Sequence, residues 1–226
     1  MIVVTGASRG LGQAICERLV SNGHEVTGLA RTASDAGPVP ILACDVSSAD
    51  AVKQVARTIK ADGKPVTGLI NAAGIAAMNL ALTTPPALAS TIIATNLLGT
   101  IYCCQAFAPL LIRQKGGAII NFSTIAVHLG LKGESIYVAS KAGVEGFSRA
   151  FAREMADFGI NVNCIAPGPI DTDLLRGISD KQIDRILRQQ IFNKQFAPED
   201  VCDLVDVLLD KKSAALSGQV LHVGGV

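Results

Sequence analysis

The sequence contains no tryptophan, few aromatic residues and few charged ones. Aromatic residues make up 4% of its 226 residues and charged residues 17%, whereas apolar residues make up 49%. This apolar content excludes a disordered chain and allows a large core, which must be built from Ala, Val, Ile and Leu. The formal net charge of +1 gives no electrostatic reason to expect nucleic acid or an anionic membrane as a partner.

The chain also lacks the cysteine patterns of metal sites and disulfide frameworks. Its six cysteines, at positions 16, 44, 103, 104, 164 and 202, include no CxxC pair and no ligand spacing with the three histidines, so we expect no metal. Scattered cysteines in an apolar chain are typical of small buried side chains in a reducing compartment. We see no signal peptide and no apolar run long enough to span a bilayer. These absences predict a cytoplasmic protein.

Short apolar runs alternate with longer stretches at helical spacing, which is typical of βαβ units and a parallel sheet. Strands are expected at 2–5, 25–30, 39–44, 66–71, 118–122, 161–165 and 220–223. Helices are expected at 11–20, 85–113, 137–158 and 199–209. Right-handed crossovers between seven strands predict an α/β fold: a single doubly wound Rossmann-type domain over residues 1–226, with a seven-stranded parallel sheet flanked by helices.

A glycine-rich segment, Thr5-Gly-Ala-Ser-Arg-Gly-Leu-Gly12, lies between the first predicted strand and the first predicted helix. Gly6, Gly10 and Gly12 would let the backbone approach a diphosphate, which then lies on the helix N-terminus. The spacing is GxxxGxG rather than the GxGxxG of the standard fingerprint. Tight packing alone accounts for many such turns. The position after the first strand of a βαβ chain nevertheless favours dinucleotide binding.

The end of the second predicted strand bears on which dinucleotide binds. An acid there holds the ribose 2′-hydroxyl of NAD, whereas arginine suits the 2′-phosphate of NADP. Arg31 stands at this end with no acid before Asp35, and Arg9 lies inside the glycine turn. Two guanidiniums can bind a phosphate dianion through bidentate, charge-assisted bonds. These residues favour NADP(H) over NAD(H); the alternative is that both arginines are ordinary solvated side chains.

Tyr137 and Lys141 are four residues apart at the start of a predicted helix, so they share one face. The pKa of a free tyrosine is near 10, and proton transfer at neutral pH needs a shift of about three units, or roughly 4 kcal/mol. A neighbouring ammonium favours the phenolate and supplies part of that shift. The pair therefore suits general acid–base chemistry, although a YxxxK spacing alone recurs by chance.

The pair lies in the sixth of seven short stretches that follow one another along the chain: TGASRGLG (5–12), Asp45-Val46, NAAG (71–74), Asn96 in TNLLGT, the INFST strand end, YVASK (137–141) and PGPIDT (167–172). With these stretches the sequence resembles a classical short-chain dehydrogenase/reductase over nearly its whole length, and in particular the 3-oxoacyl-acyl-carrier-protein reductase-like members. The resemblance implies an oxidoreductase that transfers a hydride between a nicotinamide and a carbonyl or secondary alcohol.

The resemblance implies a catalytic role for several positions. Tyr137 would be the general acid in reduction and the base in oxidation, and Lys141 would lower its pKa and hydrogen-bond the nicotinamide ribose. Asn96 would interrupt the long helix and hold a water that passes protons to Lys141. The family's substrate-binding serine is replaced by Thr124, with Ser123 one residue earlier. Neighbouring strand residues face opposite sides. Thr124 is favoured because it keeps the family spacing, and Ser123 remains the alternative.

The resemblance also implies a set of cofactor-binding positions beyond the catalytic pair. Asp45 would contact the adenine, Val46 would contact its ring through the backbone, and the end of the fourth strand and the PGPIDT segment would line the nicotinamide end. The full set is Gly6, Ser8, Arg9, Gly10, Leu11, Gly12, Arg31, Asp45, Val46, Asn71, Ala72, Gly74, Tyr137, Lys141, Pro167, Gly168, Ile170 and Thr172.

Residues 171–196 fall where the family has its variable substrate lid. Their aliphatic side chains suit an apolar or acyl substrate, although the same spacing describes an amphipathic helix on a core. The family's carrier-docking arginines are replaced by Ala118 and Phe158, with Arg113, Lys115 and Arg153 nearby. Reduction of a 3-oxoacyl chain on acyl carrier protein therefore remains a narrower alternative.

Two further expectations concern assembly and class. The resemblance implies a homotetramer or homodimer built on the two long helices and the last strand. A hypothesis from another class is a non-catalytic nucleotide-binding sensor or scaffold. The presence of both Tyr137 and Lys141 disfavours that hypothesis, because a protein without turnover has no need of them.

Overall fold

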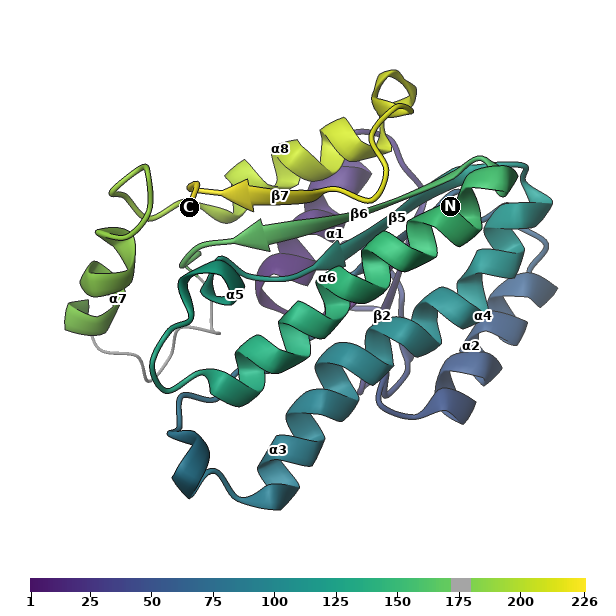
Figure 1. Cartoon of the computed structure of the whole chain (residues 1–226). Helices are drawn as coiled ribbons and strands as arrows, with labels where there is room; N and C mark the ends of the chain where they lie inside the picture. Colours follow the sequence, from purple (N-terminus) through teal and green to yellow (C-terminus); the bar gives the residue numbers. More distant parts are fainter. Residues whose placement is uncertain (172–179) are drawn as a thin grey trace.

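A seven-stranded parallel sheet forms the centre of the fold in a computed structural model that describes residues 1–171 and 180–226 (Figure 1). The strand order is β3-β2-β1-β4-β5-β6-β7, and every neighbouring pair is parallel. The strands are β1 (Ile2–Thr5), β2 (Val26–Ala30), β3 (Ile41–Ala43), β4 (Gly68–Asn71), β5 (Gly117–Phe122), β6 (Ile160–Pro167) and β7 (Val220–Val223). The predicted doubly wound Rossmann-type α/β fold is confirmed, and all seven strands lie where they were predicted to within a few residues.

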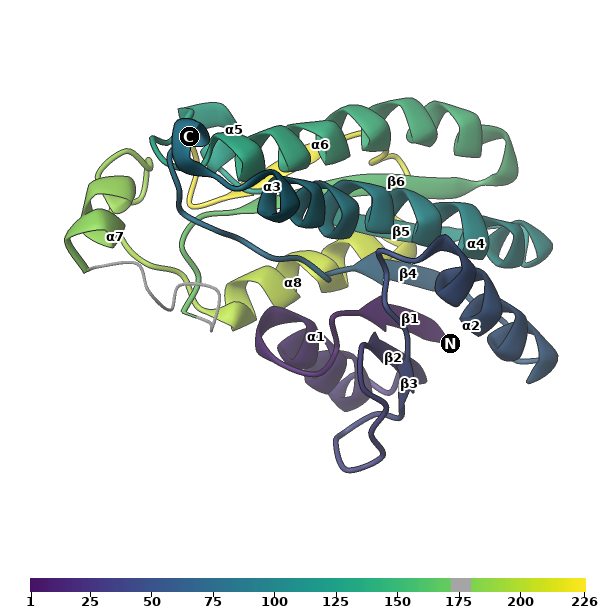
Figure 2. The same cartoon turned by 90° about the horizontal axis from the view of Figure 1, so that it is seen from below.

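Helices connect the strands and cover both faces of the sheet. The α-helices are α1 (Gly10–Ser21), α2 (Ala49–Ala61), α3 (Pro86–Ile93), α4 (Gly99–Arg113), α5 (Ala126–Leu129), α6 (Ser135–Met155), α7 (Asp180–Leu187) and α8 (Pro198–Leu209). The shorter turns are η1 (Ala81–Thr83), η2 (Ala94–Leu98), η3 (Ala156–Phe158) and η5 (Lys211–Ser213). Figure 2 shows α1 and α8 on one face of the sheet and α2, α4 and α6 on the other.

The sheet separates two hydrophobic cores because neighbouring strand residues point to opposite faces. On β4, Leu69 belongs to the core under α2, α4 and α6, whereas Ile70 belongs to the core under α1 and α8. Ile119 and Ile120 divide in the same way on β5. Strands buried on both faces read as continuous apolar runs, which is why they were recognisable in the sequence.

The helix α2 was not among the predicted helices. It begins after Ser48, whose hydroxyl accepts a hydrogen bond from the Ala51 N–H and so satisfies one of the free donors of the first turn. Its apolar positions Val52, Val55 and Ile59 recur at helical spacing and are buried against the sheet. The pattern was present, but charged residues separate these positions and the stretch reads as polar.

The long helix predicted at 85–113 is interrupted, as expected, at Asn96. The π-helical turn η2 separates α3 from α4 and places Asn96 in the interior, with no exposed surface. The continuous stretch Pro86–Arg113 is long and apolar enough to cross a membrane by length and composition, so the expectation that no run reaches this length is wrong. The contacts of α4 with α2, β4 and β5 account for the apolar residues on its buried side.

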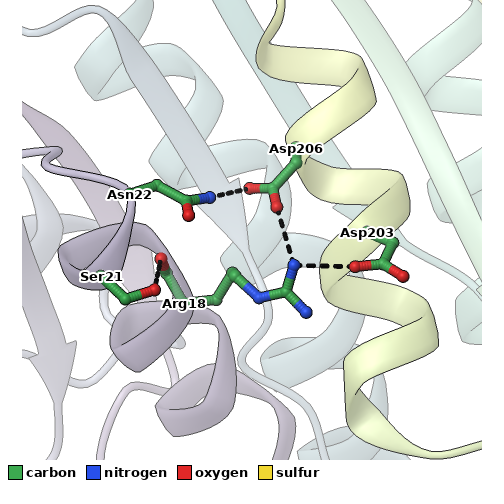
Figure 3. Close-up of polar contacts among 5 residues, drawn as sticks. All are labelled: Arg18, Ser21, Asn22, Asp203 and Asp206. Carbon is green, nitrogen blue, oxygen red and sulfur yellow. Dashed lines mark hydrogen bonds and ion pairs between the residues drawn. The ribbon is translucent and has the colours of Figure 1, made fainter.

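A polar cluster joins α1 to α8 on one face of the sheet (Figure 3). The Arg18 guanidinium donates to Asp203 at 2.7 Å and to Asp206 at 3.1 Å, and the Asn22 amide donates to Asp206 at 3.0 Å. These contacts hold the C-terminal end of α1 against a helix more than 180 residues away in sequence. The N-terminal end of α1, with its glycine turn, lies at the carboxyl end of β1.

All six cysteines are buried and free. Five of them belong to the two cores, and Cys164 is buried on β6. Their interpretation as small buried side chains is confirmed.

Candidate active site

A cleft of about 490 Å³ opens at the carboxyl ends of the strands. Segments that follow β1, β2, β3, β4, β5 and β6 all contribute to its wall. The strand order reverses between β1 and β4, and in open α/β sheets ligands bind at this switch point, outside the carboxyl ends of the strands. The volume is in the range of cofactor and substrate sites.

The glycine turn after β1 forms one end of the cleft. Gly6 has a φ of +70°, and a Cβ there would lie 2.8 Å from the Ala73 Cα, so the turn packs directly on the segment after β4. A Cβ on Gly12 would lie 2.3 Å from the Gly6 carbonyl oxygen. These contacts need glycine for packing within the protein, while the free N–H groups of the first turn of α1 remain available for a diphosphate. Four positions of this turn also line the cleft: Ser8, Arg9, Gly10 and Leu11.

The residues predicted to recognise the adenosine half lie together. Arg9, Arg31, Asp45 and Val46 all line the cleft. Neither arginine forms an ion pair with the residues that the structure describes, whereas one Asp45 oxygen accepts hydrogen bonds from the N–H and hydroxyl of Ser47 at 2.9 and 2.7 Å. These bonds, and then the charge of Arg31, lower the pKa of Asp45. The side chains of Arg9 and Arg31 are therefore available to bind an anion at this wall of the cleft.

Asn96 lies behind the cleft and does not line it. Its side-chain oxygen accepts from the Ile75 N–H at 2.9 Å, and its nitrogen donates to the Ile75 carbonyl at 2.9 Å and to the Ser140 hydroxyl at 3.0 Å. The side-chain amide therefore anchors the loop after β4 to α6. A Cβ on Gly74 would lie 3.4 Å from the Asn96 oxygen and 3.5 Å from Lys141 Nζ, so the structure brings Asn96, Gly74 and Lys141 together.

Tyr137 and Lys141 lie on the first two turns of α6 and line the cleft, yet both are nearly buried, with 8% and 5% of their surface exposed. The Lys141 ammonium donates a 2.8 Å hydrogen bond to the Phe122 carbonyl at the end of β5. The predicted shared face of the helix is thus present. Strand β5 and helix α6 together position the pair.

Burial controls the pKa of both groups. It lowers the pKa of Lys141 to about 8, because the charged form loses its water. Burial also raises the pKa of Tyr137, and the charge of Glu134 raises it further, while a hydrogen bond with Thr124 opposes these effects. The expected lowering of the Tyr137 pKa by Lys141 is therefore not seen. Tyr137 is a neutral phenol near neutral pH, which suits a proton donor.

The two neighbouring hydroxyls after β5 have different surroundings. The Ser123 hydroxyl is buried and donates to Glu145 Oε1 at 2.7 Å. Thr124 is partly exposed and lines the cleft together with Tyr137, and its hydroxyl accepts a hydrogen bond from the Ala126 N–H at 3.2 Å. Both residues line the cleft, but only the Ser123 hydroxyl is bound to a side chain of α6.

Most remaining positions of the predicted cofactor set also line the cleft. These are Gly6, Gly12, Ala72, Gly74, Pro167, Gly168 and Ile170. The prediction for Asn71 needs correction, because its amide donates to Asn121 at 2.8 Å and faces Cys104 in the core. Residues two apart on a strand share a side, so Asn71 points with Leu69 toward α4. Thr172 lies outside the described residues.

Several lining residues were missed in the sequence. The apolar ones include Ile75, Leu131 and Ile186, and the charged one is Glu134. Ile186 comes from α7, within the segment predicted as the substrate lid. Glu134 had a usable signal, since it precedes Tyr137 by three residues and such pairs share a helix face. The lining residues in loops, such as Ile75 and Leu131, belong to no regular pattern that predicts which side chains face the cleft.

Comparison with known proteins places these features in a family. A family model described as Enoyl-(Acyl carrier protein) reductase matches residues 6–225. The 3-oxoacyl-[acyl-carrier-protein] reductase of Staphylococcus epidermidis is 34% identical over 236 aligned positions, which cover 99% of this chain and 96% of that protein. The enzyme of the same name from Escherichia coli is 34% identical over 231 positions, covering 99% and 95%.

Solved structures agree with the sequence relatives. The ligand-free aldohexose dehydrogenase of Thermoplasma acidophilum has a TM-score of 0.90 and 28% identity, covering 99% of this chain and 92% of that one. A putative short-chain alcohol dehydrogenase from Sinorhizobium meliloti has a TM-score of 0.90 and 30% identity, covering 98% and 93%.

The sheet order and the cleft at its switch point define a nucleotide-binding protein of the Rossmann type. The match over residues 6–225 and the relatives at 34% identity narrow this class. The chain belongs to the short-chain dehydrogenase/reductase family, and it is an oxidoreductase for which a nicotinamide cofactor is expected.

Proposed function

We propose that this protein is an NADPH-dependent oxidoreductase that reduces a carbonyl group to a secondary alcohol, with Tyr137 as the proton donor. The observation that carries the proposal is the placement of a buried, neutral Tyr137 phenol beside the Thr124 hydroxyl and one helical turn from Lys141, on the wall of the cleft. The reverse oxidation would use the same groups with Tyr137 as the base.

The residues of the cleft fit a nicotinamide dinucleotide. The free N–H groups at the start of α1 suit the diphosphate. Arg9 and Arg31, which form no ion pair with the residues that the structure describes, suit an additional phosphate on the adenosine ribose. At the other end, Pro167, Gly168 and Ile170 line the wall that faces α6. These supports favour NADP(H) over NAD(H), because no acid lines the cleft at the end of β2 within the described residues.

The bound nicotinamide would supply the hydride that reaches the carbonyl carbon. Negative charge then grows on the carbonyl oxygen, and donors already aimed at that oxygen stabilise the charge. The Thr124 hydroxyl donates one hydrogen bond, and the Tyr137 phenol donates a second and then gives up its proton to complete the alcohol. The Lys141 ammonium, one helical turn further along the same wall, would hold the nicotinamide ribose.

Asn96 acts in this scheme as a positioning residue for Lys141. Its side-chain amide is fully used by Ile75 and Ser140, so it fixes the loop after β4 against α6, where the Lys141 ammonium lies. A water held beside Gly74 and Asn96 would relay protons to Lys141.

Reduction of 3-oxoacyl chains carried by acyl carrier protein is the narrower candidate. Two relatives at 34% identity are 3-oxoacyl-[acyl-carrier-protein] reductases and support it, as do the apolar lining residues Ile75, Leu131 and Ile186. In this case the partner would be an acidic carrier, and Arg113, Lys115 and Arg153 would be the basic residues available to dock it.

We also propose that the protein is a homodimer or homotetramer. In the apolar helical stretch Pro86–Arg113, only 33% of the most apolar window is buried within the chain. A partly uncovered apolar helix suits an interface with a second copy, since large exposed apolar patches mark interaction sites. Light scattering during size-exclusion chromatography tests the assembly, and a monomer at micromolar concentration contradicts it.

A panel of substrates tests the proposed reaction. Consumption of NADPH is followed with aliphatic ketones, aldehydes, aldoses and an acetoacetyl thioester, free and on acyl carrier protein. We expect turnover with at least one class of carbonyl compound, and a preference for the carrier-bound thioester selects the narrower candidate. Tight NADPH binding without turnover on any member would instead support a nucleotide-binding sensor and contradict the proposal.

A further inference from the structure

Glu134 is a buried carboxylate at the substrate end of the cleft. It immediately precedes α6, three residues before Tyr137, and both residues line the cleft. Residues at this spacing at the start of a helix lie on the same side. Only 9% of the Glu134 surface is exposed, so its carboxylate lies within the wall of the cleft close to the proposed proton donor.

This carboxylate makes no hydrogen bond or ion pair with the residues that the structure describes. Burial raises its pKa, and its negative charge is one of the causes that raise the pKa of Tyr137. Both Glu134 and Tyr137 line the cleft. A carboxylate that is largely covered yet has no protein partner usually has a specific reason.

Helix capping does not supply that reason. Glu134 stands at the N-cap position of α6, but its side chain accepts no hydrogen bond from the first turn. A favourable interaction with the helix dipole is available to any acid at this position and needs no burial. The charge is instead turned toward the cleft, where Ile75, Leu131 and Ile186 supply the apolar part of the wall.

The charges along the cleft divide it into two ends. Arg9, Arg31 and Asp45 lie at the end formed by β1, β2 and β3, whereas Glu134 and Lys141 lie at the end formed by β5 and α6. The Lys141 ammonium is bound to the Phe122 carbonyl. Glu134 is therefore an acceptor at this end of the cleft without a protein donor among the described residues, and the hydroxyl of a bound substrate can supply one.

We propose that Glu134 is a specificity-determining residue that selects carbonyl substrates carrying a hydroxyl group near the carbonyl and rejects those carrying a carboxylate there. The inference rests on the proposed function, because it assigns the substrate class of that same site. A substrate hydroxyl donates to the carboxylate and satisfies it. A substrate carboxylate would place a second negative charge in a site of low polarity, and like charges there repel strongly.

Two pairs of ketones matched in size separate these effects. The first pair is 4-hydroxy-2-butanone and 2-pentanone, which differ by a hydroxyl in place of a methyl group. The second pair is levulinate and levulinamide, which differ by a negative charge. For each pair the ratio of kcat/KM values with NADPH is measured in the wild type, in Glu134→Leu and in the nearly isosteric Glu134→Gln.

We expect the wild type to prefer the hydroxyketone by about 10-fold or more, the range of a hydrogen bond to a charged group. Glu134→Leu should bring this ratio close to one. Glu134→Gln should keep an acceptor and part of the preference, while its ratio of levulinate to levulinamide should rise by about 10-fold, because the opposing charge is gone. Glu154→Gln makes the same chemical change at an exposed position of α6 and should leave both ratios unchanged.

The outcomes distinguish this inference from the proposed function. Turnover of the ketones with equal ratios in the wild type and both variants overturns the role of Glu134 and leaves the proposed function standing. Absence of turnover on every ketone by a wild type that binds NADPH overturns the proposed function, and the inference falls with it. If Glu134→Leu fails to fold, the ratio of kcat/KM for levulinate to that for levulinamide in Glu134→Gln still tests the role of Glu134.

Discussion

The Ser123 hydroxyl donates a 2.7 Å hydrogen bond to Glu145 Oε1, so this hydroxyl already has a partner within the protein although Ser123 also lines the cleft. Glu145 lies on α6, two helical turns after Tyr137, with 9% of its surface exposed. Asn121, two residues before Ser123, is bound in the same way to Ser148 of α6. Thr124 follows the end of β5 at Phe122 and lines the cleft together with Tyr137.

We therefore expect the two hydroxyls to differ in what their loss changes. Thr124→Val, which keeps the shape of the side chain, should lower kcat/KM by about 10²- to 10³-fold, as for other donors to a developing oxyanion. Ser123→Ala should keep kcat/KM within a few-fold and reduce the free energy of unfolding by about 1–3 kcal/mol, because Glu145 loses a buried partner. Steady-state kinetics and urea unfolding of both variants measure this, and the reverse pattern would assign the substrate hydroxyl to Ser123.

Tyr137→Phe removes the proposed proton donor and keeps the ring. The rate of carbonyl reduction should fall by about 10²- to 10⁴-fold, the usual contribution of a general acid, while the Kd for NADPH stays within a few-fold of the wild type. Fluorescence titration and single-turnover kinetics separate binding from chemistry. Near-normal reduction by Tyr137→Phe would exclude Tyr137 as the donor.

Arg31→Ala tests the choice of cofactor. The guanidinium lines the cleft and has no ion pair among the described residues, so its loss should weaken NADPH binding by about 10- to 100-fold, the range of a charge-assisted hydrogen bond. NADH binding should change little, because NADH lacks the phosphate. Arg57→Ala removes an exposed arginine from α2 and serves as the control. An equal loss for both nucleotides would mean that Arg31 binds a part they share.

The buried Lys141 makes stability depend on pH. Its pKa is about 8 in the folded protein, against 10.5 for a solvated lysine. Between these values the unfolded chain holds the proton and the folded chain has released it, so the free energy of unfolding rises with pH across this window. From about pH 8 to about pH 9.5 the wild type should gain about 2 kcal/mol relative to Lys141→Met. Urea unfolding at these two pH values checks the difference, and parallel curves for the two proteins would contradict the lowered pKa.

The sheet and the glycine turn were predictable because their signals are local. Strands buried on both faces leave unbroken apolar runs such as Ile119-Ile120, and a glycine turn directly after the first strand of a parallel sheet is typical of nucleotide phosphate binding. The Tyr137–Lys141 spacing predicts a shared helix face for the same reason. The helix α2 was missed because charged residues separate its buried apolar positions and make the stretch read as polar, although its capping serine at position 48 was a usable signal.

The direction of single side chains was the harder part of the site. Alternation along β4 and β5 puts Asn71 and Ser123 on the side of Leu69 and Ile119, but the residue order does not tell which side the helix α6 closes. Asn71 was therefore placed in the cleft by resemblance and lies in the core instead. The acid at Glu134 was passed over because its burial depends on the loop that brings it beside Tyr137.

The amino-acid sequence by itself determined the fold class and the places of the glycine turn and of the proposed acid–base pair, because periodicity and turn chemistry act over a few neighbouring residues. Only the tertiary structure decided which hydroxyl meets the phenol, that burial raises the pKa of Tyr137, and that the Glu134 carboxylate stands unpartnered among the described residues of the cleft. These depend on the packing of β5, α6 and the loop between them. Packing alone sets which atoms lose water and which find a partner.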